Sequence, residues 1–394
     1  MQFASAISRE DQIEAAIDET LDTLAQQAPE LVADIVFVFA TPHHLKALAD
    51  QLPEIQKRLD APILIGCTGG GVIGDRREVE RRSALAILTA SMPGVSVTPF
   101  HVEQSSIEDL SPNYWQSRFD FGDEDEPAFV LLPDPFTIDA QKLLDSLNDA
   151  YPLRPVVGGL ASGSQSASSC ALFLNGEVVH GAVGLGLSGN FNLHTVVSQG
   201  CRPIGDPQVI TRCENQIIYE LGGRPALEVI LTMIESLPPA DQRLARSALL
   251  MGRVIDEYKD KFDRGDFLIR MLMGADKESG AIAVGDVFRP GQTVQLHVRD
   301  AATAREDLHE LMHNVSHHLE GQAASGALLF SCNGRGSHLY GEPDHDSRVV
   351  AETTGPVPIA GFFCNGEIGP IGNTNFLHGF TASIGIFQEK PQSE

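Results

Sequence analysis

The chain has 394 residues, with 28 Lys plus Arg against 53 Asp plus Glu, so its net charge is −25. At roughly 150 residues per domain, this length predicts two or three domains. An acidic surface repels phosphate backbones and anionic lipid head groups, so we do not expect nucleic acids or membrane surfaces as partners.

The spacing of the cysteines and the hydropathy of the sequence predict the cellular compartment of the protein. The six cysteines are scattered, with no CxxC pair and no framework spacing, which is typical of reduced thiols. The first residues, MQFASAISREDQ, lack a basic segment followed by an apolar stretch, so no signal peptide is expected. No apolar run in the sequence approaches the ~20 residues of a membrane-spanning helix. We therefore expect a cytoplasmic protein.

The N-terminal elements are predicted to alternate between helices and buried strands. A helix is expected from Ser8, because Ser8 and Asp11 form a capping-box pattern. Thr41 fits the N-cap of a second helix. The continuous apolar runs IVFVFA and ILIG predict buried strands on either side of this helix. Strand, helix and strand in this order favour a parallel strand pair.

The following stretch is richer in strands. Strands are predicted at 83–90 and 95–102, joined by a turn at Pro93-Gly94. A helix is expected from Thr137, and Asn175-Gly176 between apolar runs is a strong signal of a β-hairpin. Further apolar runs predict strands at 128–132 and 155–159.

A boundary is predicted at 201–223, where glycines and a proline break the periodic pattern, between a domain at 1–200 and a domain at 224–394. Mixed strands with outer helices favour an α/β (α+β) fold of two related domains, each with mixed β-sheets flanked by helices. In the second domain, helices are predicted at 225–234, 241–248 and 300–319, and strands at 248–254, 267–274, 293–300, 327–332, 356–363 and 381–387.

Four apolar strands run directly into glycine-rich turns, two in each half of the chain. Glycine permits positive φ angles and a close approach of the backbone to a ligand, so such turns suit the lining of one pocket or of two. The four segments are ILIGCTGGGVIG (63–74), VVGGLASG (156–163), LLFSCNGRG (328–336) and PIAGFFCNGEIGPIG (358–372).

Two formal motifs are interpreted as coincidental. Gly69–Gly74 matches GxGxxG, but the helix and the acidic residue of a dinucleotide site do not follow it. His309–His313 matches HExxH, but the apolar stripe of this predicted helix should face the core, which turns the histidines towards solvent. No metal is expected, and the weak surface candidates are His309, His313 and His317.

The segments around Arg335 and Glu367 concentrate amide, cationic and carboxylate side chains in glycine turns. Arg335 fits a ligand carboxylate and Glu367 fits a ligand amine, while asparagine side chains orient the molecule. The alternative is that Arg335 and Glu367 pair with each other or cap the turns. The predicted ligand-binding residues are Thr68, Gly70, Cys332, Asn333, Arg335, Asn365, Glu367, Asn375 and His378, and no catalytic residue is predicted.

The same segments carry a family resemblance. LLFSCNGRG, PVPIAGFFCNGEIGPIG and NFLHGFTAS resemble the C-terminal FIST domain, and IVFVFATP with PILIGCTGGGVIG resembles the N-terminal FIST domain. The stretch SQGCRPIGDPQVITRCENQIIYELGGRPALEVI resembles the junction between them. The resemblance implies an intracellular sensory protein, not an enzyme. It would bind a small ligand such as an amino acid and signal to a separate partner, such as a histidine kinase or a cyclic-nucleotide enzyme.

Three alternatives stand beside this expectation. Some family members bind haem and respond to nitric oxide, so the resemblance allows a haem-based sensor, although no cofactor is expected. Cys332, Cys364 and the HExxH match allow a cysteine- or zinc-dependent hydrolase, although small buried thiols are the simpler interpretation. An interaction scaffold without a ligand is the third alternative.

Overall fold

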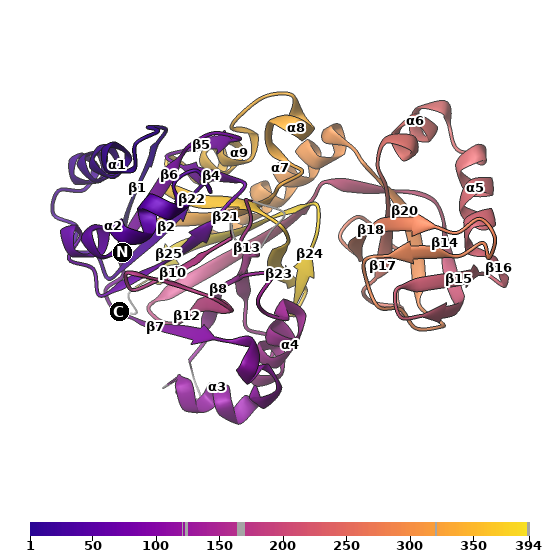
Figure 1. Cartoon of the computed structure of the whole chain (residues 1–394), viewed down its shortest axis with the longest axis horizontal. Helices are drawn as coiled ribbons and strands as arrows, with labels where there is room; N and C mark the ends of the chain where they lie inside the picture. Colours follow the sequence, from indigo (N-terminus) through magenta and orange to yellow (C-terminus); the bar gives the residue numbers. More distant parts are fainter. Residues whose placement is uncertain (120, 123–124, 164–169, 320, 392–394) are drawn as a thin grey trace. The chain divides into compact units, whose positions relative to one another are not determined.

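The computed structural model describes residues 1–119, 121–122, 125–163, 170–319 and 321–391, and its contacts divide the chain into two compact units (Figure 1). The first unit, which we name the three-sheet body, comprises Met1–Val197, Leu308–Leu377 and Thr381–Glu394. The second, which we name the barrel unit, comprises Ser198–Asp307 and His378–Phe380. Among the described residues, no helix is both long enough and apolar enough to cross a membrane.

The N-terminal sheet of the three-sheet body is mixed, and helices α1 (Ile13–Gln27) and α2 (Leu45–Arg58) cover its outer face. Its strand order is β1 (Gln2–Ser8), β6 (Leu85–Ser91), β2 (Ile35–Ala40), β3 (Ile63–Thr68), β10 (Leu172–Leu174) and β11 (Glu177–Val179). β2 and β3 pair in parallel, and β10 and β11 form a hairpin, so both predicted pairings are confirmed. The hairpin turn places Asn175 and Gly176 at φ of +48° and +84°, the left-handed region that such a turn requires.

Side-chain alternation explains why the run IVFVFA is apolar throughout. Ile35, Phe37 and Phe39 point into the centre of the body, whereas Val36 and Val38 pack beneath the two helices. Because both faces of β2 are buried, both alternating sets of side chains must be apolar.

Two further mixed sheets complete the body. The middle sheet has the order β24 (Thr374–His378), β23 (Glu367–Ile371), β9 (Val156–Gly159), β8 (Ala128–Pro133), β12 (Ala182–Gly189) and β7 (Val95–Val102). The C-terminal sheet has the order β13 (Phe191–Gln199), β25 (Thr381–Glu389), β21 (Gly326–Cys332), β22 (Ile359–Cys364), β4 (Gly71–Gly74) and β5 (Arg77–Glu80). The outer helices are α3 (Pro112–Arg118) and α4 (Ala140–Ala150) on the middle sheet, and α7 (Ala301–His318) and α9 (His345–Thr354) on the C-terminal sheet.

Two strand pairs join segments that are far apart in the sequence. β22 pairs with β4, and β23 pairs with β9, where Glu367 lies opposite Gly159. The C-terminal part of the chain therefore completes sheets that the N-terminal part begins. The predicted division into 1–200, 201–223 and 224–394 concerns domains that are continuous in the sequence, and it stays a prediction. The two compact units are defined by spatial contacts, and each combines segments that are far apart in the sequence.

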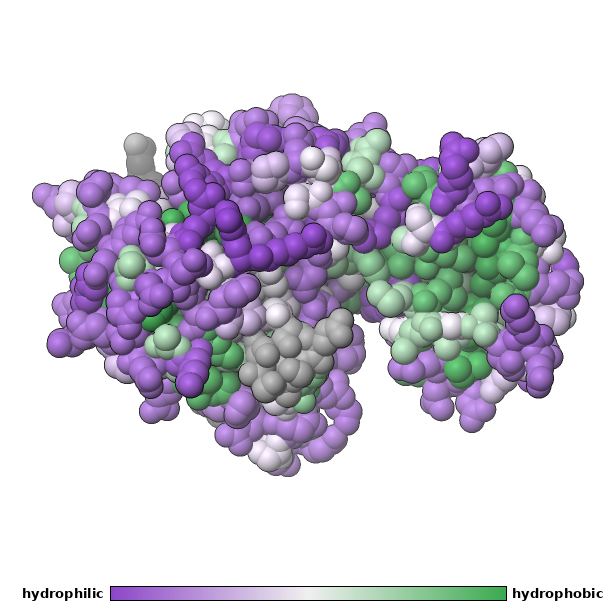
Figure 2. Space-filling model, turned by 45° about the horizontal axis from the view of Figure 1, so that its top comes forward, coloured by the Kyte–Doolittle hydropathy of each residue, from purple (hydrophilic) through white to green (hydrophobic). Residues whose placement is uncertain are grey.

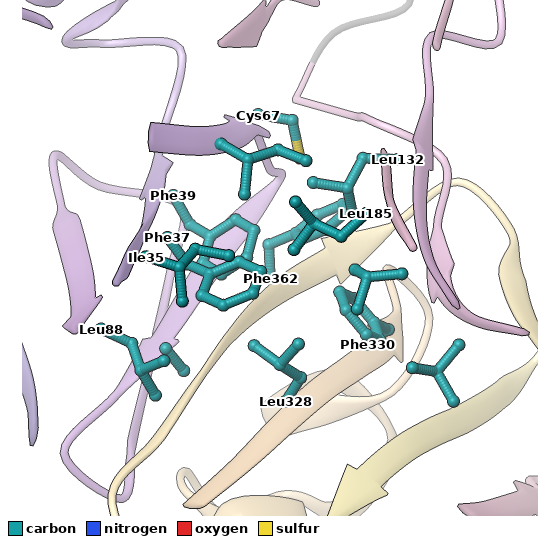
Figure 3. Packing of buried hydrophobic residues seen from close by; sticks show 14 of the residues in the cluster. Ile35, Phe37, Phe39, Cys67, Leu88, Leu132, Leu185, Leu328, Phe330 and Phe362 are labelled. Carbon is teal, nitrogen blue, oxygen red and sulfur yellow. The ribbon is translucent and has the colours of Figure 1, made fainter. Parts of the chain in front are cut away.

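The inner faces of the three sheets enclose one apolar core (Figure 3). It includes Phe39 from the N-terminal sheet, Leu132 from the middle sheet and Phe362 from the C-terminal sheet. The rings of Phe39 and Phe362 stack with their centroids 5.3 Å apart. Burying an apolar side chain of this size stabilises a fold by roughly 1.5–3 kcal/mol, so this core fixes how the sheets meet.

The barrel unit is a closed antiparallel sheet flanked by α5 (Ala226–Ser236) and α6 (Pro239–Ser247). Its order is β14 (Cys201–Glu214), β20 (Thr293–Arg299), β17 (Leu249–Val254), β18 (Phe267–Ala275), β19 (Ile282–Val284), β15 (Ile217–Leu221) and β16 (Arg224–Pro225). Pairing of β14 with β15 closes the ring, so residues 201–223 form strands. Figure 2 shows apolar side chains gathered on the visible face of this unit, whereas hydrophilic side chains cover most of the visible face of the three-sheet body.

Local signals misplace two helix starts and one strand pairing. Ser8 ends β1, so the predicted capping box is wrong, and α1 begins at Ile13. α2 begins at Leu45 with His44 as its N-cap, so Thr41 does not have the predicted role. The strands β6 and β7 lie in different sheets, so the turn between them connects two sheets. Long-range strand pairing outweighs the local patterns here, and the other predicted helices and strands are present with ends shifted by a few residues.

Candidate functional site

The carboxyl ends of β21 and β22 lie side by side, because the two strands are parallel neighbours and Cys332 is opposite Cys364. The turns that follow carry Asn333 and Asn365, whose side chains are exposed. Nδ2 of Asn333 donates a hydrogen bond to Oδ1 of Asn365 (2.9 Å), and the backbone N–H of Asn333 donates to the carbonyl of Cys364 (3.0 Å). The two C-terminal glycine turns therefore form one unit.

The turn after β3 joins the same assembly. The N–H of Gly70 donates to Oγ of Ser162 (2.8 Å) and to the carbonyl of Phe363 (3.2 Å). The N–H of Ser162 donates to the carbonyl of Thr68 (3.0 Å), and the Ser162 hydroxyl donates to the carbonyl of Phe363. All four glycine-rich segments thus meet in one hydrogen-bonded assembly, which we name the strand-end cluster. Sequence reasoning did not select Ser162, because only the fold places it between the two halves of the chain.

Close packing explains why two positions of the strand-end cluster are glycine. A β-carbon at Gly70 would lie 2.3 Å from Oδ1 of Asn333, and one at Gly159 would lie 2.4 Å from Sγ of Cys364. Carbon atoms do not approach other heavy atoms this closely without displacing them. Any larger residue at either position would therefore move a polar group of the cluster.

Glu367 supplies the carboxyl group of the strand-end cluster and is fully buried. Its Oε2 accepts hydrogen bonds from the N–H of Thr381 (3.1 Å) and from the Thr381 hydroxyl (2.8 Å). Its Oε1 accepts no hydrogen bond from the described residues. Burial raises the pKa of Glu367 to about 8, although Thr381, the charge of Arg335 and the thiol of Cys332 act in the opposite direction. At neutral pH the carboxyl is mostly protonated, and one of its oxygens has no partner in the described chain.

Three thiols belong to the same region. Cys364 and Cys67 are fully buried, and burial raises the pKa of both thiols well above the usual range. The nearby Glu367 carboxyl raises the pKa of Cys364 further. Cys332 is partly exposed, and all six cysteines, which lie within the described residues, are free of disulfide bonds. A thiol that stays protonated is a poor nucleophile, so Cys364 and Cys67 are unsuited to covalent catalysis.

Arg335 is paired with Asp346 and not with Glu367. Its guanidinium is fully buried and donates from Nε to Oδ2 of Asp346 (2.7 Å) and from Nη2 to Oδ1 (3.0 Å). Nη2 also donates to the hydroxyl of Tyr340 (2.6 Å). Burial alone would raise the pKa of Asp346, but Arg335 and His345 outweigh burial and hold that pKa below its usual range. A ligand carboxylate would have to displace Asp346, a residue that sequence reasoning did not select.

A second buried carboxyl lies beside this ion pair. Oε1 of Glu78 accepts a hydrogen bond from the N–H of Ser347 (2.8 Å), whereas its Oε2 accepts none from the described residues. Burial and then the charge of Asp346 raise the pKa of Glu78 to about 8. Sequence reasoning missed Glu78, because it stands in the charged run DRREVERR, which has the composition of an exposed segment.

Two predicted ligand-binding residues are placed elsewhere. Oδ1 of Asn375 accepts from the N–H of Val156 (2.8 Å), and its Nδ2 donates to the carbonyl of Arg154 (2.8 Å) and to Oδ1 of Asn148 (2.8 Å). Both ends of this amide are therefore used to hold β24 against neighbouring backbone. His378 is buried and is grouped with the barrel unit. Thr68 contributes its hydroxyl to structure as well, since Oγ1 accepts from the N–H of Ala171 (3.0 Å).

The apolar stripe of α7 faces the core as predicted, with Leu308 and Met312 buried. His309, His313 and His317 are exposed, and the Nε2 atoms of His313 and His317 lie 3.1 Å apart. Within the described ranges of the chain, no group of three or more His, Cys, Asp and Glu side chains is arranged to hold a metal ion.

Comparison with known proteins identifies the domains. A family model described as the FIST N domain matches residues 34–224, and one described as the FIST C domain matches residues 226–370. An uncharacterised protein of Mycobacterium bovis, Mb0898c, is 39% identical over 383 residues, which cover 96% of each chain. Another uncharacterised protein, Rv0628c of Mycobacterium tuberculosis, is 39% identical over 345 residues, 87% of this chain and 88% of that protein. The chain therefore belongs to the FIST family, whose sensory domains are suggested to bind small ligands.

Proposed function

We propose that this protein is a sensor of a small molecule that carries an amino group, and that this group binds at the strand-end cluster. The observation that carries the proposal is Glu367, a fully buried carboxyl with one oxygen that accepts no hydrogen bond from the described residues. A buried polar atom without a partner costs roughly 1–3 kcal/mol, so such an atom in a native protein calls for a partner that binds there. A ligand ammonium supplies both the missing hydrogen bond and a compensating charge.

The surroundings of Glu367 suit an amino acid or a related metabolite. Asn333 and Asn365 are exposed at the ends of the same strands and offer amide donors and acceptors to the rest of the ligand. Gly70 and Ser162 bring the N-terminal turns to the same place. A ligand bound here contacts both halves of the sequence, and its differential affinity for two arrangements of the turns can bias their populations.

In this proposal, the signal passes to a separate cytoplasmic partner, such as a histidine kinase or a cyclic-nucleotide enzyme, and the protein performs no chemistry itself. The raised pKa of the buried Cys364 and Cys67 thiols supports a non-catalytic role, because a nucleophilic cysteine needs a stabilised thiolate. The FIST family is a sensory and non-catalytic domain family, which supports the same reading.

Haem is the alternative ligand that the family resemblance allows. Four pockets formed by described residues have volumes of about 300, 440, 520 and 440 Å³, and no histidine is among their lining residues. None of these four offers the axial imidazole that a haem iron needs. Hemin is therefore included in the ligand screen as the test of this alternative.

The test is a thermal-shift screen of the full chain with L-amino acids, simple primary amines, matching carboxylic acids without an amine, and hemin. A ligand that binds only the folded state stabilises it by about 2.7 kcal/mol at a concentration about 100 times its Kd. We expect amino-bearing compounds to raise the Tm and their amine-free counterparts to leave it unchanged. Isothermal titration of the best compound then measures its Kd.

The variant Glu367→Gln keeps the shape of the side chain but removes a carboxyl that can ionise when a cationic ligand binds. We expect it to weaken the response to the amine strongly, because an amide oxygen accepts a hydrogen bond from an ammonium but supplies no compensating negative charge. Glu78→Gln is the matched control, since Glu78 is another buried carboxyl of the same body with a pKa raised to about 8. The proposal is wrong if Glu367→Gln folds and binds the amine as tightly as the wild type.

A further inference from the structure

Two cysteines from neighbouring strands stand directly opposite each other at the strand-end cluster. Cys332 and Cys364 form the last pair in the parallel register of β21 and β22. Alternation places both side chains on the inner face of the C-terminal sheet, with Phe330 and Phe362 two residues earlier on the same face. Neighbouring strands lie about 4.7–4.9 Å apart, which is inside the range of about 4.4–6.8 Å between the Cα atoms of a disulfide.

The two thiols differ in access. Cys332 is partly exposed, whereas Cys364 is fully buried with its thiol donating to the carbonyl of Phe362 (3.4 Å). Both residues are the last of their strands and precede glycine turns, where the backbone can adjust without breaking a continuous strand. An accessible thiol beside a protected one is the arrangement of an oxidant-sensing cysteine with a resolving partner.

We propose that Cys332 and Cys364 form a peroxide-sensitive dithiol, which closes to a disulfide across the ends of β21 and β22. This is a second input at the strand-end cluster, and it does not rest on the amine ligand proposed above. A disulfide there would tie together the two turns that carry Asn333 and Asn365. We therefore expect the oxidised protein to respond differently to any ligand of the cluster.

The reaction is a two-electron oxidation with hydrogen peroxide as the oxidant. The sulfur of Cys332 attacks one peroxide oxygen, the O–O bond breaks, and the thiol proton leaves with the other oxygen as water. Burial keeps the Cys364 thiol protonated, so it gives up its proton only as its sulfur attacks the resulting sulfenic acid of Cys332; the S–O bond breaks, and a second water leaves with that proton. The Cys332 thiol interacts with the Glu367 carboxyl and lowers the pKa of that group, so the thiol that reacts first lies beside Glu367.

The experiment uses the full chain, reduced, freed of reductant and treated with hydrogen peroxide without any ligand. We expect the protein to lose two hydrogen atoms by intact mass, to lose two alkylatable thiols, and to yield one cross-linked peptide pair containing Cys332 and Cys364. Dithiothreitol should reverse all three changes. Because no ligand is present, failure of the amine-binding proposal would not affect this result.

Three serine variants make the test specific. Cys332→Ser and Cys364→Ser should each prevent the cross-link, and thermal melting checks that each variant is folded. Cys213→Ser is the matched control, because Cys213 is also only partly buried but lies in the barrel unit, and it should leave the cross-link intact. Irreversible oxidation of Cys332 without a cross-link, or a cross-link of Cys364 to Cys67, would overturn the proposal. So would a thiol count that hydrogen peroxide leaves unchanged.

Discussion

Two buried polar regions flank the same strand, β21, and each holds a carboxyl with one oxygen that has no partner among the described residues, but only the helix-covered region also contains a buried ion pair. On the helix-covered face, Ser331 donates from Oγ to Oδ2 of Asp346 (3.0 Å), next to the ion pair of Asp346 with Arg335. On the inner face, the next residue, Cys332, lies beside Glu367, whose Oε1 has no partner among the described residues. Alternation along one strand thus sends consecutive residues into two different polar environments.

We interpret this difference as separating the structural role of Arg335 from the binding role proposed for Glu367. Arg335 has a carboxylate and a tyrosine hydroxyl as partners, so its charge is used in holding α9 to the sheet. Among the described residues, hydrogen bonds reach only one of the two carboxyl oxygens of Glu367. The sequence predicts Arg335 and Glu367 as two halves of a ligand site, whereas Arg335 is bonded to Asp346, so we propose the binding role for Glu367 alone. Variants at these positions test this contrast.

The largest expected effect comes from removing the partner of Arg335. Asp346→Asn removes the carboxylate that is hydrogen-bonded to a fully buried guanidinium, and breaking a buried ion pair in this way costs roughly 3–5 kcal/mol. We expect the free energy of unfolding, measured by urea titration, to fall by this amount. The double variant Arg335→Met with Asp346→Leu should recover much of the loss. A loss below about 1 kcal/mol would show that Arg335 is not held by Asp346 and is available to a ligand.

Periodic and local features of the fold are predictable from the sequence, but the hydrogen-bond and ion-pair partners of the buried polar residues are not. The run IVFVFA, the turn at Asn175-Gly176 and the stripe of α7 each have a cause within a few residues. The Asp346 partner of Arg335 has no such signal, because any of 53 acidic residues could pair with it. The contact of Gly70 with Ser162 likewise depends on how three sheets meet. Sequence patterns therefore locate much of the strand-end cluster, and only the tertiary structure shows which of its groups are already used.

The next effect is a pH dependence of stability. Glu367 and Glu78 both have a pKa of about 8 in the folded protein, against an ordinary value of 4.5. Between these values the folded state binds more protons than the unfolded state, so the contribution is complete below pH 4.5 and is lost as the pH rises through 8. One retained proton gives a slope of about 1.4 kcal/mol per pH unit.

Urea titrations at several pH values in this window measure the slope. Glu367→Gln and Glu78→Gln should each remove the contribution of one proton, and the double variant should remove both. If neither variant changes the slope, both carboxyls are ionised in the folded protein. In that case Glu367 must already have a cationic partner.

A smaller effect on stability, but a large one on binding, is expected from Gly70→Ala. The new β-carbon meets Oδ1 of Asn333, the free end of an exposed side chain that can move away, so the cost should be about 1 kcal/mol. The displaced Asn333 should nevertheless weaken the amine response at least tenfold, measured as the change in Kd. Gly274→Ala is the control, because a β-carbon there meets nothing within 4 Å and Gly274 lies in the barrel unit. Equal affinities for the two variants would place the ligand away from Asn333.

The smallest effect is expected at the histidines of α7. The triple variant His309→Ala, His313→Ala and His317→Ala changes only exposed side chains on the face opposite the core, so stability should stay within about 0.5 kcal/mol of the wild type. Its response to the amine should be unchanged as well, because the described contacts of these three histidines do not reach the strand-end cluster. Zinc titration followed by the Tm makes this prediction sharper. A zinc-induced rise in the Tm of the wild type that the triple variant lacks would show that the HExxH row binds metal. The protein would then have a binding site outside the two polar regions that flank β21.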